Sequence, residues 1–494
     1  MLQGFCPTIR NGQIPCVPGG INVNGLKNYL KPLTILSPGA EKNGDQKMKL
    51  KLKMPALSLL LIVALAGAIF VPVVSAENVV PVDATINMKY FTDISDQLKS
   101  RSTESVPISE YSLVTVDPIA FMRDADNGKL LEYSLNGENY SIELSEVPSI
   151  IAPDAKLYIK TNDGTTVSDI PTIKQYQGRI VGTKSGDAFF TVDDNVILGR
   201  ITMDDESYFI SQSERQADGK IVHIVYNSKN EIEREILPNE DDIIPITISQ
   251  EQLELSDNNE IENTISSKSV TTVSLLAVYD SQFHNAYPSS TSEITSMMST
   301  VAEAFSPSYI GVNFQINAFS WDATLTSTDK DDLAEELVDS QSSYRDSTNS
   351  DLVSLFTGRD LDGNDIGNGG QFTNGVYEES AYSLTQMTDS GTSYTASSYQ
   401  RPILITHELG HNFGAMHQTA PSSYSGAPFY IPSYARASTW TSWWTDYYSA
   451  MWAPFQTGTS MKNEFSSLDS GHGDSNHNNA LRISQVKATV AGYQ

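Results

Sequence analysis

Three of the seven histidines in this 494-residue chain fall within residues 407–417. His407 and His411 are four positions apart, so on an α-helix both imidazoles leave the same face about one turn apart. Gly414 can adopt a positive φ, which would end such a helix and turn the chain so that His417 returns as a third ligand. The spacing therefore predicts a helix, a glycine turn and a site where three neutral nitrogens hold one Zn²⁺.

The same segment carries a group suited to proton transfer. Glu408 adjoins the first ligand and leans toward the open coordination position without being a ligand itself. Three histidines leave one position for water, which is the arrangement of a catalytic rather than a structural zinc site. His-Glu-x-x-His is also a metalloprotease signature. We expect zinc to activate a water molecule and Glu408 to act as its general base.

Residues 407–417 together resemble the metzincin metalloproteases, and Thr406–Gly414 looks most like the reprolysin (adamalysin, ADAM-type) branch. Metzincins carry a methionine turn beneath the zinc, and Ser449-Ala450-Met451 is similar to that turn. Met451 is therefore the expected apolar floor under the histidines, with Met461 as the weaker alternative. The resemblance implies an α/β (α+β) catalytic domain with a mixed sheet, an active-site helix and a smaller irregular lower subdomain.

Other segments extend the resemblance. Residues 355–363 with Ile366-Gly367 are similar to the reprolysin segment before its edge strand, which implies that an extended peptide or protein substrate pairs there as an added strand. Residues 176–182, 198–201 and 207–210 resemble the reprolysin propeptide. The chain departs from the family at Gln418, where reprolysins usually have Asp.

Cysteines mark a second departure. Cys6 and Cys16 are the only two, so the main body can form neither disulfides nor a thiolate metal site. Latency, if present, must then come from another propeptide ligand or from steric cover. The resemblance thus indicates an atypical, cysteine-free member.

The N-terminal region predicts export. Lysines at 47, 49, 51 and 53 precede an uncharged apolar run from Pro55 to Val74, and Val74-Ser75-Ala76 offers the small residues of a signal-peptidase site. We expect residues 48–76 to be a signal peptide cleaved after Ala76, with a retained membrane anchor as the alternative. Residues 1–47 have no place before such a signal and are interpreted as a non-native extension preceding a true start at Met48.

The rest of the chain divides in two. Residues 77–269 are expected to form a β-rich propeptide domain, in which His223 alternates along a strand and is interpreted as structural. An acidic stretch without aromatics, from Gln250 to about Lys268, is typical of a linker. A processing site is expected at about residues 262–270. Residues 270–494 would be the catalytic domain.

Hydrophobic periodicity predicts the elements of that last domain. The expected strands are 273–280, 311–319 and 352–356. The expected helices are 292–305, 331–340, 403–413 and 478–490.

Three lesser patterns remain open. Asp360–Asp365 is spaced like the start of a calcium loop, but the bidentate Glu is absent, so a surface turn is favoured. Asp469, His472, Asp474 and His477 could hold a second ion, although a solvated loop with an N-cap for the last helix is the simpler interpretation. The aromatic residues between Trp440 and Trp452 are expected to be mostly core, with one or two lining an apolar pocket for the side chain after the scissile bond.

Net charge and the resemblance together frame the expected function. A net charge of −28 leaves no basic face for nucleic acid. The resemblance implies a secreted or extracellular zinc endopeptidase made as a precursor, acting on extended peptides, without stable membrane insertion after signal cleavage. The alternatives are a non-catalytic cell-surface binding protein that kept the zinc fold, and a membrane-tethered sheddase that retains residues 55–76.

Overall fold

The computed structural model describes residues 86–98, 108–135, 137–204, 206–232, 243–244 (backbone), 269–363, 365–370, 372, 378–388, 397–419, 432–442, 445–456 and 458–493. The predicted extension, signal peptide and acidic linker lie outside these ranges. The described residues belong to one compact unit. Within them, no helix has the length and apolar character needed to cross a membrane.

An antiparallel ten-stranded sheet forms most of the N-terminal region, in the order β1-β4-β5-β8-β9-β10-β11-β12-β3-β2. Alternating buried side chains from these strands enclose Phe121 of helix α3 and form a hydrophobic core. The region is β-rich, as the sequence predicts. Asp193, Asp194 and Asn195 form the turn between β9 and β10, as such residues favour. The strands are β1 (Asn87–Met88), β2 (Phe91–Asp93), β3 (Ser112–Val116), β4 (Leu131–Leu135), β5 (Glu138–Val147), β8 (Lys174–Ile180), β9 (Asp187–Val192), β10 (Ile197–Met203), β11 (Glu206–Ala217) and β12 (Lys220–Asn227).

Short helices and one buried histidine complete this region. Helix α3 (Pro118–Asp126) begins with a proline that needs no amide partner there, and Asp117 caps it by accepting from Ala120 N at 3.0 Å. His223 on β12 is fully buried, and its Nε2 accepts from Ile197 N at 3.3 Å. Burial lowers the pKa of His223 to about 4. Its structural interpretation is thereby confirmed. The remaining short helices are α2 (Ser95–Leu98) and η2 (Ser228–Asn230).

A mixed eight-stranded sheet forms the C-terminal region, in the order β13-β17-β18-β16-β14-β15-β6-β7. Strands β14 and β16 are buried on both faces, which explains why they are nearly continuous apolar runs. Only the β17–β18 and β6–β7 pairs are antiparallel. The strands are β6 (Ile151–Thr161), β7 (Gly164–Asp169), β13 (Ile243–Ile244), β14 (Thr271–Tyr279), β15 (Val312–Asp322), β16 (Leu352–Thr357), β17 (Gly367–Gly370) and β18 (Tyr382–Gln386).

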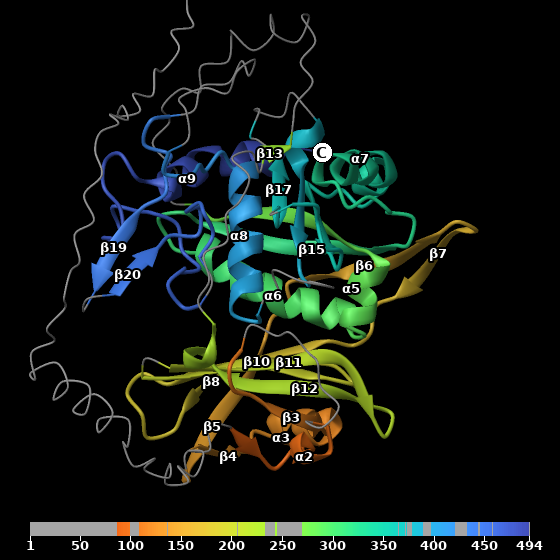
Figure 1. Ribbon diagram of the computed structural model, residues 1–494, viewed down its shortest axis with the longest axis vertical. Helices are drawn as coiled ribbons and strands as arrows, with labels where there is room; N and C mark the ends of the chain where they lie inside the picture. Colours follow the sequence, from red (N-terminus) through yellow and green to blue (C-terminus); the bar gives the residue numbers. More distant parts are fainter. Residues whose placement is uncertain are drawn as a thin grey trace, which may run out of the picture. The chain divides into compact units, whose positions relative to one another are not determined.

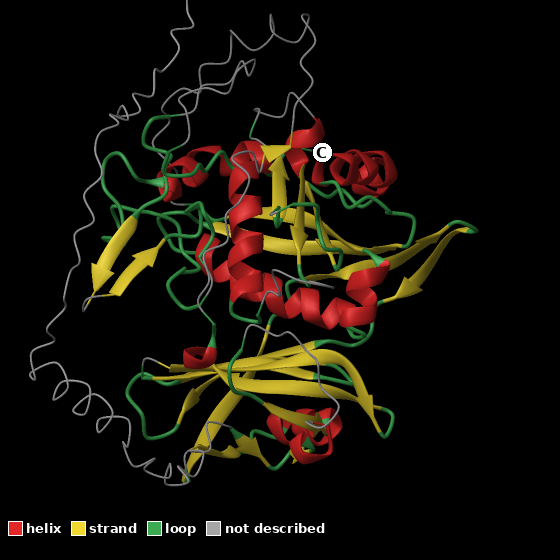
Figure 2. Ribbon diagram, in the orientation of Figure 1, coloured by secondary structure: helices red, strands yellow, loops and turns green. Residues whose placement is uncertain are grey.

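Helices gather around this mixed sheet, whereas the ten-stranded sheet has few (Figure 2). The four expected helices are present, and α7 is longer at both ends because Asp329 caps its N-terminus and Arg345 of its last turn is buried. Asn478 caps α9 through Leu481 N at 3.0 Å, as expected. The helices are α5 (Ser281–Ala286), α6 (Ser290–Phe305), α7 (Lys330–Ser347), α8 (Gln400–Asn412), α9 (Asn479–Val490) and the 3₁₀ turn η3 (Glu378–Ala381).

Two features differ from what the residues by themselves predict. Hairpin β6–β7 lies in the stretch assigned to the N-terminal domain, yet it joins the mixed sheet by pairing with β15 (Figure 1). Strand β17 has the sequence Gly-Asn-Gly-Gly, which has no intrinsic strand preference, so only the family resemblance, and not the residues themselves, implied an edge strand here. After α8 the described chain is largely irregular, apart from helix α9 and a small hairpin of β19 (Thr439–Ser442) and β20 (Thr445–Tyr448). The mixed α/β architecture agrees with the expected fold class.

Candidate metal centre and active site

Helix α8 carries the histidine motif and is buried along its whole length, from Gln400 to Asn412. It packs against β17 and β18 on one side and α6 on another. Pro402 lies in the first turn, where the missing amide hydrogen costs nothing. Complete burial explains why the helix has few charged residues, and it makes Arg401, Glu408 and the two histidines exceptions that need a specific environment.

The helix ends where the sequence predicts, at a glycine turn. Gly414 has φ +72°, its amide donates to His411 O at 2.8 Å, and Ala415 N donates to Gly410 O at 3.0 Å. These two bonds form a Schellman motif, which reverses the chain direction. The reversal returns His417 to the face of α8 that carries the other two histidines.

His407, His411 and His417 come together as an equilateral group. Each pair of ring centroids is 5.0 Å apart, and a nitrogen from each ring lies within 4.8 Å of the others. The rings are at most 8% exposed. In the described part of the chain this is the one cluster of histidine, cysteine or carboxylate groups with metal-ligand spacing.

Backbone carbonyls set the tautomers of the first two histidines. His407 Nδ1 lies 2.7 Å from Ala450 O, and His411 Nδ1 lies 3.0 Å from Ala415 O. A carbonyl oxygen only accepts, so each Nδ1 carries the proton and each Nε2 presents a lone pair. This second layer of bonds orients metal-binding imidazoles in proteins. The nitrogens of these two oriented imidazoles, with His417 Nε2 3.0 Å from His407 Nε2, therefore fit a zinc ion.

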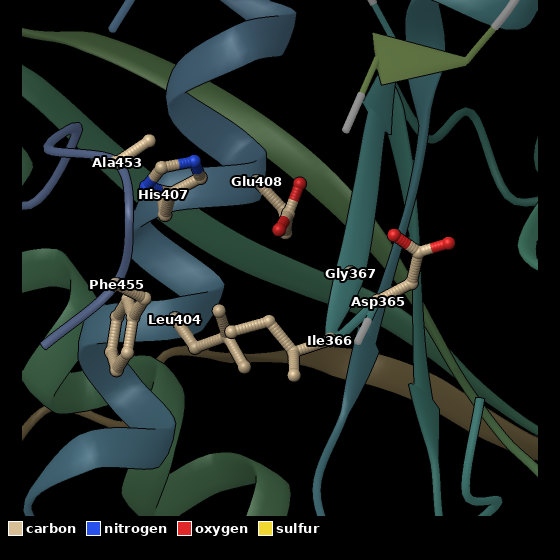
Figure 3. A pocket seen from close by; sticks show the side chains of 8 residues that line it. All are labelled: Asp365, Ile366, Gly367, Leu404, His407, Glu408, Ala453 and Phe455. Carbon is tan, nitrogen blue, oxygen red and sulfur yellow. The ribbon is translucent and has the colours of Figure 1, made fainter. Parts of the chain in front are cut away.

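Glu408 lies between α8 and the edge of the mixed sheet, and it is 1% exposed. A Cβ atom on Gly367 would overlap the Glu408 carboxylate, and one on Gly369 would lie 2.8 Å from His411 Cβ. The glycines of β17 therefore let the sheet edge approach the helix. Figure 3 shows the carboxylate of Glu408 directed toward the Gly367 strand, next to His407.

Met451 packs against helix α8 at Gly410, the residue before His411. Its side chain is fully buried, and its sulfur occupies the space where a Cβ on Gly410 would lie. The preceding residue, Ala450, supplies the carbonyl that orients His407. The alternative, Met461, lies instead in a separate apolar cluster with Leu404 and Phe455. The turn at residues 449–452 thus contacts both the helix and a proposed ligand.

A small apolar pocket of about 10 Å³, partly open to solvent, adjoins His407 and Glu408. Leu404, Ile366 and Phe455 converge on one side of it, and Asp365 lies at the other (Figure 3). Its lining among the described residues includes none of the aromatics from the expected stretch. Trp440 stacks on His472, whereas Tyr448 and Trp452, whose ring centroids are 5.3 Å apart, pack against the apolar cluster that contains Ile366, Leu404 and Phe455. Trp443 and Trp444 lie outside the described residues.

Gln418, the departure from the reprolysin pattern, contacts the pocket wall. Its amide Nε2 donates to Ala453 O, and its Oε1 accepts from Ala453 N at 3.1 Å. The side chain thereby pairs with one residue of the wall as a neighbouring strand would. The sequence shows Gln418 as a departure from the reprolysin pattern, but it does not predict this contact, because the two residues are 35 positions apart.

The lesser ion sites do not assemble. Asp365 pairs with Lys330 at 3.5 Å, and Gln386 Nε2 donates to Asp360 at 3.5 Å, so these carboxylates do not form a ligand group among the described residues. His472 instead pairs with Glu464, and His477 Nδ1 lies 2.9 Å from Asp474. The simpler interpretations, a turn and a loop with an N-cap, agree with the structure.

The fold and the site together define a class. A mixed α/β domain with three converging histidines, two of them oriented by backbone carbonyls, and an adjacent buried glutamate is the arrangement of a metallopeptidase. Residues 269–445 match the family model for metallo-peptidase family M12 (Reprolysin_5). This family match and the histidine cluster support a zinc peptidase.

Comparison with individual proteins adds two partial structural similarities. One solved structure, described as a chaperone-substrate complex, is 13% identical with a TM-score of 0.33, and the match covers 46% of this chain and 35% of that one. The present chain thus spans about a third of it. Metalloproteinase-II from Bacteroides fragilis is 10% identical with a TM-score of 0.36, and the match covers 60% of this chain and 83% of that one. No curated protein matches the sequence.

Proposed function

We propose that this chain is the precursor of a secreted zinc-dependent endopeptidase of the reprolysin-like metzincin type. The observation that carries the proposal is the convergence of His407, His411 and His417 beside the buried Glu408. Zinc bound there would supply an acidified water and polarise the scissile carbonyl. Glu408 would take the proton of that water and deliver it to the leaving amine.

The surroundings of the site support an extended peptide substrate. Strand β17 lies between β18 and the two-residue strand β13, so it becomes the edge of the mixed sheet when β13 leaves. It carries almost no side chains, so a peptide main chain can then approach it as an added strand. The apolar lining of the adjoining pocket, formed by Leu404, Ile366 and Phe455, favours an apolar side chain after the scissile bond. A preference for charged residues at that position in cleavage-site profiling would contradict this assignment.

The pairing of β13 with β17 supports a latent precursor. Ile243 and Ile244 precede the acidic linker and lie parallel to Gly369 and Gly370, on the edge where the substrate would pair. Strand β13 would have to leave this edge before a substrate binds. It would therefore block the substrate site sterically, so latency would not require a cysteine that binds zinc. We therefore expect peptide hydrolysis to rise when the linker at residues 250–268 is cut.

The proposed catalysis is tested by replacing Glu408 with Gln, which keeps the shape but cannot accept a proton. We expect zinc content to stay at one ion per chain, while kcat for a peptide library falls about 10²- to 10⁴-fold. The control is Glu335→Gln, an exposed glutamate on α7, together with a chelator-treated sample. Near-normal turnover by zinc-loaded Glu408→Gln protein would remove the assigned role and favour a non-catalytic binding protein.

Secretion is tested separately. N-terminal sequencing of the exported protein should place the new terminus after Ala76, and fractionation should find the protein outside the cell. Recovery in the membrane fraction with residues 55–76 attached would favour the tethered sheddase.

A further inference from the structure

Hairpin β6–β7 lies within the proposed propeptide but completes the sheet of the proposed catalytic domain. Strand β6 runs parallel to β15 from Ile316 to Asp322, with one register shift. Ile316 N donates to Ile150 O at 2.8 Å, and Ala323 N donates to Lys160 O at 2.9 Å, so the bonding spans the length of the strand. Without the hairpin, β15 would be an open sheet edge.

Side chains reinforce this main-chain pairing. Lys160 Nζ lies 3.3 Å from Asp322 Oδ2, and Asp322 is fully buried. Tyr158 packs on Tyr344 of α7 with ring centroids 5.1 Å apart, and Thr165 Oγ1 lies 2.5 Å from Tyr344 Oη. A buried carboxylate that loses its cationic partner is costly, so departure of the hairpin would destabilise the domain it leaves.

The ten-stranded sheet forms a second contact, on helix α6. Gln212 is buried and bonds both Ser289 and Glu293, the latter at 3.0 Å. Arg200 donates two bonds to Glu303, at 3.0 and 3.2 Å. The two contact regions lie at separate parts of the catalytic domain, α6 and the β15 edge, so both must break for the N-terminal region to separate.

We infer that cutting the linker does not release the N-terminal domain, and that the mature enzyme is a two-chain complex whose catalytic sheet contains β6 and β7. This inference rests on the proposed precursor function. It assigns the N-terminal domain a lasting role as a bound subunit of the protease, with the hairpin as its anchor. Only the covering strand β13 then has to leave the sheet edge for activation.

The experiment uses the full chain with a site-specific protease sequence inserted in the linker at residues 250–268 and an affinity tag on the C-terminus. It carries Glu408→Gln, so that self-cleavage and activity play no part in the result. After cleavage, the two pieces should co-elute in gel filtration and in the tag eluate, separating only in denaturant. Elution of the tagged piece alone under native conditions would overturn the inference.

Hydrogen exchange gives a second readout on the same sample. The amides of Ile316 and Ala323 should remain protected after the linker is cut, because β6 still accepts their hydrogen bonds. Fast exchange at both amides in the cut protein would show that the hairpin has left.

Two lysines on the same strand provide the matched variants. Lys160→Ala removes the cation beside buried Asp322, whereas Lys156→Ala removes an exposed lysine that pairs only with Asp169 of the same hairpin. In the cut complex, Lys160→Ala should raise the dissociation constant at least tenfold over Lys156→Ala. Equal dissociation constants would overturn the anchoring role of the hairpin. Because none of these readouts is catalytic, they stand apart from zinc-dependent cleavage, which alone tests the proposed function.

Discussion

Glycines shape the proposed active site as much as its histidines do. Gly414 supplies the left-handed turn that returns His417, and a Cβ there would also lie 2.8 Å from Arg482 Nε. Gly367 leaves the space that the Glu408 carboxylate occupies. The first requirement is conformational and the second is steric, so substitutions at the two positions should fail in different ways.

Gly414→Ala should weaken zinc binding. A non-glycine residue at φ +72° costs about 1 kcal/mol of folding free energy, and relaxation of that strain would displace His417. The measurement is zinc affinity by competition with a chelator, alongside urea unfolding. Gly471→Ala is the control, because Gly471 also has a positive φ, +78°, but no atom lies within 4 Å of its added Cβ. Equal zinc affinities in the two variants would contradict the role of Gly414.

Gly367→Ala should impair turnover more than metal binding. The added methyl overlaps the Glu408 carboxylate and must displace it, and misplacing a catalytic group by about 1 Å can lower the rate about 10²-fold. Steady-state kinetics with zinc analysis on the same sample checks this. Gly492→Ala, whose nearest new contact is Thr489 O at 3.5 Å, should leave both unchanged.

Elements meet at the active site in a way that depends on contacts distant in sequence. The pocket wall at Ala453 is held by Gln418 from the segment after the third histidine. The turn at residues 449–452 orients His407, and β17 sets the position of Glu408. None of these pairs is local, so the site is built only when helix, turn and edge strand are packed together.

Gln418→Ala should weaken the packing of the pocket wall at Ala453 and therefore weaken substrate binding. Loss of both bonds to Ala453 should raise KM for peptides with a large apolar residue after the scissile bond, with kcat/KM about tenfold lower for two hydrogen bonds. The control is Gln456→Ala, which removes a bond to Pro454 O within the wall segment itself. Unchanged KM in Gln418→Ala protein would show that the wall needs no such support.

At the scale of the whole molecule, a buried carboxyl lies where the N-terminal sheet meets the start of α8. Glu231 follows β12, and Tyr226 of that strand accepts from Tyr399 N at 3.2 Å. Burial raises the pKa of Glu231 to about 7, while Ser397, Tyr226 and Arg401 act in the opposite direction. The folded protein therefore holds a proton on Glu231 at pH values where the unfolded chain has lost it.

Stability should consequently fall as the pH rises. The protonated carboxyl contributes fully below the unfolded pKa, 4.5, and its contribution is lost as the pH rises through about 7, a linked change of roughly 3 kcal/mol. Urea unfolding between pH 4.5 and 8 measures it. The free energy of unfolding of Glu231→Gln protein should depend less on pH by this amount. That of the exposed control Glu110→Gln should change with pH as it does in the parent protein. If the unfolding free energies of Glu231→Gln and the parent protein changed with pH in parallel, Glu231 would not be the group responsible.

Much of this arrangement follows from local sequence. The spacing of His407, His411, Gly414 and His417 predicts a helix, its end and three converging rings, because helical periodicity and glycine geometry act within a few residues. Buried strands such as β14 and amphipathic helices such as α6 are likewise visible in their apolar patterns. The mixed α/β class follows from the alternation of these elements.

Tertiary packing decided the rest. Strand β17 is a strand because α8 and β18 hold its glycines, not because Gly-Asn-Gly-Gly prefers that conformation. Hairpin β6–β7 looks like any amphipathic hairpin, and only the open edge of β15 determines which sheet it joins. The pocket residues Leu404, Ile366 and Phe455 come from three separate segments. Local patterns specify which elements form, whereas strand partners and pocket walls depend on contacts between residues far apart in the chain.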